Sequence, residues 1–117
     1  MEQKNYVMLR GHVGNVRLSK VGERFVCNFS VATNSIRRNA EGRPEEETTW
    51  HTCVAWSSNK RLPDLSTVTV GAPVEVEGSF RNSKYVGMDG VERTSQEISV
   101  NSLVLLPPEE RLLTPAL

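Results

Sequence analysis

Cysteine is scarce in this sequence, with only two among 117 residues, too few for a disulfide framework. No hydrophobic run approaches the roughly 18 residues that a transmembrane helix needs, so we expect no membrane span. The first residues, Met-Glu-Gln-Lys-Asn, lead into no signal-peptide core. Without an export signal, the expected location is the cytoplasm.

An excess of either charge is also lacking, because 14 Lys and Arg residues balance 14 Asp and Glu residues. This balance excludes a uniformly basic nucleic-acid coat and leaves a locally basic groove open. Alanine, the best helix former, occurs only 5 times, whereas valine occurs 15 times and threonine 8 times. That composition favours β structure. With 38% hydrophobic and 24% charged residues, the chain is ordinary for one globular domain.

Apolar and polar side chains alternate along five segments, as they do in half-buried strands. In the third of these segments, Trp50, Thr52, Val54 and Trp56 share one face. We expect the five strands at residues 5–18, 24–34, 48–56, 72–80 and 93–106.

The connections between these strands differ in kind. Residues 36–47 are polar and predict a long hairpin connection, and Asp89-Gly90 predicts a hairpin turn. Residues 57–70 are ambiguous, because they leave room for a short helix while Pro63 argues against a long one. Five strands with this one interruption are typical of the OB-fold, a small all-β Greek-key barrel. The strand count alone leaves an SH3-like barrel or a small sandwich open.

Four segments carry a pattern that is shared with one known family. They are N-Y-V-M-L-R-G-H-V-G at 5–14, F-S-V-A-T-N at 29–34, T-T-W-H-T-C-V-A-W at 48–56 and V-E-V-E-G-S-F-R at 74–81. Each is weak alone, but in this order and spacing they resemble the bacterial single-stranded DNA-binding protein (SSB) family over about residues 3–106.

The resemblance implies an OB-fold domain over residues 1–106 that binds single-stranded DNA (ssDNA) without sequence preference. It also implies a role in DNA replication, recombination or repair, assembly into a tetramer or dimer, and a place at the bacterial nucleoid. Family members often continue into an acidic tip that recruits replication and repair proteins. Here residues 107–117 form only a short tail, which resembles tailless relatives. The missing tip and the balanced charge favour an alternative, an OB-fold adaptor of the primosome type that acts through protein partners.

By position, Trp50, Trp56 and Tyr85 match the base-stacking aromatic residues of the family. The chain departs from the pattern at Ile36, where an aromatic residue is common, and at Thr52, where a basic residue is common. We expect Tyr85 in the loop between the last two strands and three arginines in the loop after the second strand. The expected phosphate contacts are Arg37, Arg38, Arg43, Arg81, Lys84 and Arg93.

An aromatic ring on a barrel surface can stack on any base, and nearby cations can neutralise phosphates. The alternative for the tryptophans is core packing, and the alternation of side chains does not decide between the two. The resemblance favours stacking. For the loop arginines, the alternative is pairing with neighbouring acidic residues such as Glu41 and Glu45-Glu46-Glu47.

No catalytic constellation is present in the sequence, and we expect neither an enzyme nor a cofactor. The residues His12, His51, Cys27 and Cys53 lack the close pairing that zinc sites show. We therefore expect no metal, and we expect two buried thiols instead.

Overall fold

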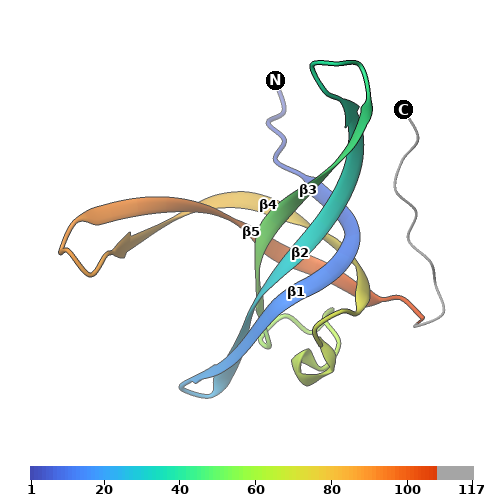
Figure 1. Ribbon diagram of the computed structural model, residues 1–117. Helices are drawn as coiled ribbons and strands as arrows, with labels where there is room; N and C mark the ends of the chain where they lie inside the picture. Colours follow the sequence, from blue (N-terminus) through green and yellow to red (C-terminus); the bar gives the residue numbers. More distant parts are fainter. Residues whose placement is uncertain (108–117) are drawn as a thin grey trace.

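The computed structural model describes residues 1–107, which form five long strands around one core (Figure 1). A single short 3-10 helix, η1 (Leu65–Thr67), interrupts them. The strands are β1 (Val7–Val21), β2 (Arg24–Arg38), β3 (Pro44–Trp56), β4 (Pro73–Val86) and β5 (Glu92–Leu105). The predicted tail lies outside the described residues from residue 108 onward.

The strands close into a barrel in the order β1-β2-β3-β5-β4. Neighbouring strands are antiparallel except β3 and β5, which close the barrel through a short parallel pairing of Cys53 with Ile98 and of Val54 with Ser99. The connection between β3 and β4 contains one short 3-10 helix, η1, and no α-helix. This five-stranded closed barrel is the OB-fold, so the predicted fold class is confirmed.

The core is filled by the inward-facing half of each alternating pattern. Burial raises the pKa of Cys53 to about 12 and also raises that of Cys27, so both thiols stay protonated; neither forms a disulfide. The buried core residues are Val7, Val13, Cys27, Phe29, Val31, Cys53, Ala55, Leu65, Val68, Val74, Val76, Ile98, Val100 and Leu103.

β2, β3 and β4 are longer than the alternation predicts, and the predicted long connection over residues 36–47 is wrong. β2 continues to Arg38 and β3 begins at Pro44, so a turn of five residues is left. Thr48 Oγ1 donates to Asn34 Oδ1 at 2.7 Å across this hairpin. Sequence patterns miss such extensions because both faces of the hairpin are exposed to solvent. Without a buried face, apolar and polar residues do not alternate along the strand.

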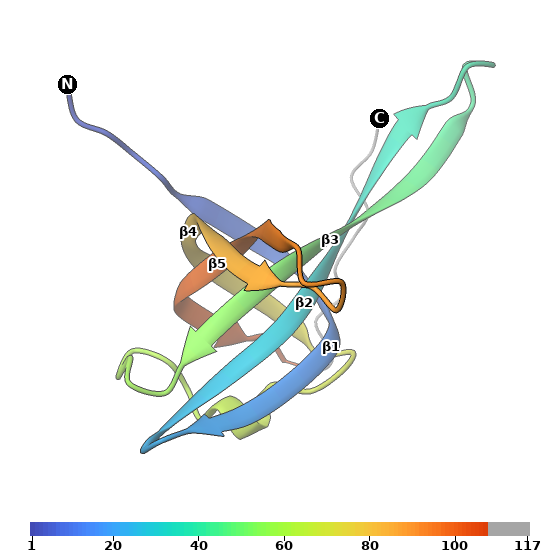
Figure 2. The ribbon, with the colours of Figure 1, turned by 90° about the vertical axis from the view of Figure 1, so that its left-hand side faces the viewer.

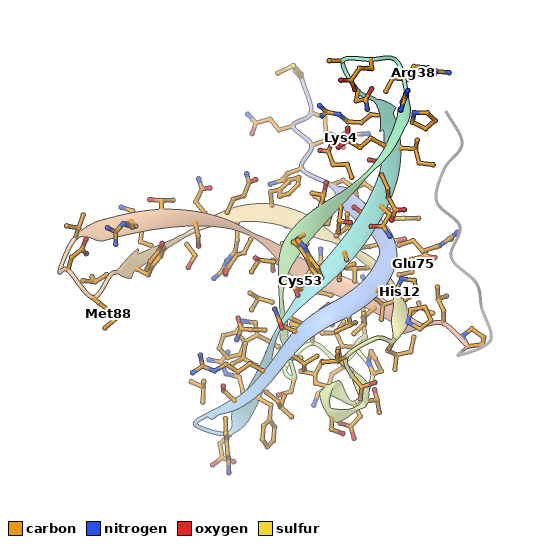
Figure 3. The ribbon with its side chains drawn as sticks, viewed as in Figure 1. Lys4, His12, Arg38, Cys53, Glu75 and Met88 are labelled. Atoms are coloured by element: carbon orange, nitrogen blue, oxygen red, sulfur yellow. The ribbon has the colours of Figure 1, made fainter. Side chains whose placement is uncertain are left out.

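Three hairpins project from the barrel as twisted arms (Figures 1 and 2). Arg38 marks the tip of the β2–β3 arm and Met88 the tip of the β4–β5 arm (Figure 3). The third arm joins β1 to β2 through Gly22, whose φ of 63° lies in the left-handed region. The arms widen the surface of a small barrel.

β1 contains a bulge close to Gly14. Its register with β2 shifts between Val13 and Val16. At the other end of the barrel, Asp64 caps η1 by accepting a hydrogen bond from the backbone of Ser66 at 3.0 Å. The sequence left room for a short helix within residues 57–70, and η1 is a single 3-10 turn of three residues. In residues 1–107 no helix has the length and apolar character to cross a membrane.

Candidate nucleic-acid interface

The two tryptophans share one face of β3, as the alternation predicts, and this face is the outer one. Trp50 is 60% exposed, and Trp56, at the end of the strand, is half-buried. They are six residues apart, which is about 20 Å along an extended strand. Thr52 lies between them, beside Ser30 of β2. The face therefore offers two rings that are separated by a polar floor.

Trp50 leans across the neighbouring strand. It registers with Ala32 of β2, yet its indole reaches Gly14 in the bulge of β1. A Cβ at Gly14 would collide with Cζ3 of this ring. Glycine at this position thus makes room for the indole, which lies against the β1 backbone while most of its surface stays in solvent. This placement answers the question of core packing, because Trp50 is no core residue.

Trp56 has a different environment. The guanidinium carbon of Arg24 lies 4.6 Å from the centroid of its ring, within the range of a cation–π contact. Trp56 registers with Val26 of β2. Val26 and Val54 are each only 7% exposed, although neither belongs to the core cluster. Trp56 is thus one edge of a small apolar patch on the outer face.

Arg17 is a cation that sequence reasoning missed. It registers with Asn28, and Asn28 registers with Val54. Arg17 is therefore on the outer face, in line with a point between the two tryptophans. It is exposed and forms no ion pair within residues 1–107. The sequence does not predict that Arg17 faces outward, because the bulge shifts the alternation of inward and outward residues along β1.

Tyr85 lies in β4 rather than in a loop, so that prediction is wrong in detail. It registers with Arg93 of β5 and is 48% exposed. Both residues are on the β4–β5 arm, whose tip at Met88 is well apart from Cys53 of β3 (Figure 3). The structure thus keeps Tyr85 exposed but does not bring it into contact with the tryptophans.

The predicted cations are distributed over two arms. Arg37 and Arg38 lie in β2 rather than in a loop, and Arg43 lies in the turn that follows. Arg81 and Lys84 lie in β4, and Arg93 in β5, beside Tyr85. The two groups of cations thus lie on the β2–β3 arm and on the β4–β5 arm, which project in different directions (Figure 1).

Most of these cations already have partners. The guanidinium of Arg38 donates to the Gly42 carbonyl at 2.7 Å, whereas Arg43 forms no ion pair with any described residue. Four of the cations form exposed ion pairs with carboxylates. Such exposed ion pairs contribute little to the stability of the fold, so a phosphate can replace the carboxylate. The ion pairs are Arg37–Glu47 at 2.9 Å, Arg81–Glu97 at 3.0 Å, Lys84–Glu92 at 3.8 Å and Arg93–Asp89 at 2.6 Å.

His51, one of the weaker candidates, has a partner on the neighbouring strand. His51 Nε2 and Thr33 Oγ1 are hydrogen-bonded at 2.9 Å, and burial lowers the pKa of this histidine. Among residues 1–107, no three His, Cys, Asp or Glu side chains are gathered closely enough to hold a metal ion.

The closed barrel and the outer face that carries Trp50 and Trp56 define the chain as an OB-fold protein with aromatic side chains on its surface. It belongs to the single-strand binding protein family, whose family model matches residues 4–106. Recognition of the family from four sequence segments is therefore confirmed.

Known proteins similar to this chain include two curated bacterial relatives. The chain is 35% identical over 107 residues to the single-stranded DNA-binding protein of Xanthomonas campestris pv. campestris and 36% identical over 107 residues to that of Neisseria meningitidis serogroup A. In both comparisons the match covers 87% of this chain, but only 60% and 59% of the relatives. This chain thus spans about three fifths of their length.

A solved structure shows a similar fold together with a ligand. It is the Plasmodium falciparum SSB in complex with ssDNA, with a TM-score of 0.74 and 28% sequence identity. The match covers 92% of this chain and 98% of that one. The barrel of this chain is thus similar to one that holds a single strand.

Proposed function

We propose that this protein binds ssDNA without sequence preference and protects it during DNA replication, recombination or repair. The observation that carries the proposal is the pair of tryptophans on one outer face, with the Trp50 indole laid over Gly14 and open to solvent. Family membership and the ssDNA-bound structural neighbour support it. The proposed place of action is the bacterial cytoplasm at the nucleoid, and the proposed role is binding without catalysis.

The proposed mechanism combines stacking and charge. Every base has a flat face, so Trp50, Trp56 and, on its arm, Tyr85 can each stack on whichever base is present. Phosphates lie on the outside of such a path, where cations on the arms and on β1 can reach them. Arg17 would serve the stretch between the tryptophans. The proposed phosphate contacts on the arms are Arg37, Arg38, Arg43, Arg81, Lys84 and Arg93.

The adaptor alternative is not favoured. The curated relatives are named as single-stranded DNA-binding proteins, and a structural neighbour is described in complex with ssDNA. Replication or repair proteins are further proposed partners of the DNA-bound form.

A direct test compares single with double strands. Fluorescence anisotropy of a labelled oligo(dT) should rise and saturate as protein is added, while a duplex of equal length should bind far more weakly because its base faces are already stacked. Equal affinity for the two would contradict base stacking. No binding to either would contradict the proposed function.

Binding should weaken as salt rises. On a single strand, the logarithm of the association constant falls by about 0.7 for each phosphate neutralised per tenfold rise in salt. Arg17 and Arg43, which form no ion pair within residues 1–107, therefore predict a slope at least as steep as about −1.4. The same anisotropy titration between about 50 and 200 mM NaCl measures it. Tight binding with no salt dependence would mean that stacking acts without phosphate contacts.

We also propose that the protein assembles into a tetramer or a dimer. β1 pairs with β4 from Val7 to His12 but with β2 only from His12 onward. Within the described residues, one edge of its first half thus carries no strand, and such an edge invites pairing in a closed symmetric assembly. Light scattering at micromolar concentration should give two or four times the chain mass of 13.1 kDa. A mass of one chain would contradict assembly.

A further inference from the structure

We propose that Arg24 is a phosphate-binding residue of the ssDNA path, held on the Trp56 ring in the free protein and transferred to the DNA backbone when a base stacks there. This inference rests on the proposed ssDNA binding and adds to it a residue that the sequence motifs do not mark. It also gives the two tryptophans different roles: Trp50 is open in the free protein, while Trp56 carries a replaceable cation.

The position of Arg24 follows from the strand register. Arg24 opens β2 directly after the turn at Gly22, and it registers with Val21. Two residues later on the same face, Val26 registers with Trp56. Arg24 is thus the diagonal neighbour of Trp56 across the β2–β3 pair, a separation that a long side chain spans. Its guanidinium carbon accordingly lies 4.6 Å from the ring centroid.

The charge of Arg24 is not neutralised by a carboxylate. It takes part in none of the ion pairs among residues 1–107, whereas four of the six cations that the sequence singles out do. Its contact in the free protein is a ring, which cannot cancel a full positive charge. Arg17 on the neighbouring strand is likewise unpaired, so this end of the face carries two cations without counter-charges.

A base and a guanidinium compete for the ring. Trp56 is half-buried, so a base that stacks on its exposed surface meets the guanidinium there. The side chain of Arg24 is exposed and long, and its planar fork matches phosphate oxygens. Arg24 exchanges its contact with the Trp56 ring for a contact with a phosphate. A base of the DNA then stacks on the ring in its place. No bond is made or broken in this step.

The test measures the salt dependence of oligo(dT) binding for three variants. Arg24→Gln removes the charge and should flatten the slope by about 0.7, with weaker binding at low salt and convergence with the wild type at high salt. Arg24→Lys keeps the charge and should keep the slope. Arg10→Gln is the matched control, because Arg10 lies where β1 pairs with β4 and contacts Glu75 at 2.8 Å; its slope should equal that of the wild type.

The outcomes separate this inference from the proposed function. If Arg24→Gln binds with the wild-type slope, or binds more tightly, Arg24 is only a cover on the ring and the inference is overturned while ssDNA binding stands. If the wild type itself fails to bind oligo(dT), the proposed function and the inference fall together. Thermal melting of the Arg24 variants should match the wild type, since Arg24 is exposed. Light scattering of Arg10→Gln should give the wild-type mass, which checks that the β1 edge proposed for assembly is intact.

Discussion

Trp50→Ala should weaken ssDNA binding by about 1–3 kcal/mol, roughly 5- to 150-fold, and leave the melting temperature nearly unchanged. The ring is 60% exposed and lies on the backbone of Gly14 rather than in the core. Its removal therefore costs stacking on the ligand and little packing. Anisotropy titration with oligo(dT) and thermal melting of the same preparation measure the two effects.

Two further variants sharpen this prediction. Gly14→Ala keeps the indole of Trp50 but forces it to move, because the added methyl group collides with its Cζ3 atom. The affinity for ssDNA should fall by less than in Trp50→Ala. Tyr6→Ala removes another exposed aromatic ring, outside the outer face of β3, and should bind like the wild type. A Trp50→Ala protein that melts far earlier yet binds normally when folded would show that the ring is structural.

Trp56→Ala should lower both affinity and stability. The ring is half-buried and sits beside Val26, which with Val54 is buried outside the core. Full burial would make the loss about 3–5 kcal/mol of unfolding free energy; for a half-buried ring we expect about 1–3 kcal/mol. Loss of stacking should add about 1–3 kcal/mol in binding. Urea denaturation and oligo(dT) titration measure the two terms.

Trp56→Phe is the control for the losses of stability and of affinity that we expect in Trp56→Ala. A phenyl ring still covers part of the apolar patch and still offers a stacking face, so most of the stability and part of the affinity should return. Unchanged stability in Trp56→Ala would mean that the ring does not cover Val26 and Val54. Unchanged affinity would remove Trp56 from the binding path.

The sequence predicts the barrel well because each of its strands has one dry face. Val74, Val76, Ile98 and Val100 alternate with polar neighbours for this reason, and they are all buried. The arms are different, since both of their faces are largely exposed to solvent and their few apolar residues, such as Tyr85 and Val86, mark no buried face. Tyr85 was therefore expected in a loop, although it continues β4 and pairs with Arg93.

The candidate site could be predicted only where a motif marks it. Trp50 and Trp56 belong to such a motif, and their shared face follows from strand geometry. Arg17 and Arg24 belong to none, and their place depends on the bulge in β1 and on the register that the turn at Gly22 sets. Long-range register is not contained in a local pattern.

The sequence also does not predict which acidic residue pairs with which basic residue. Glu47 was one of several acidic residues that could pair with the arginines before the turn, and only the hairpin register brings it to Arg37 at 2.9 Å. Arg81 and Glu97 are brought together in the same way by β4 and β5. Counting basic residues therefore overestimates the cations that are free to meet phosphates.

Intrinsic fluorescence tests the central claim most directly, because the chain contains only two tryptophans and both belong to the proposed interface. Titration with poly(dT) should quench the emission strongly, with a sharp endpoint at a fixed number of nucleotides per protein, as bases stack on Trp50 and Trp56. Emission that does not change while poly(dT) is added, or that changes equally with duplex DNA, would contradict binding of single strands by this face.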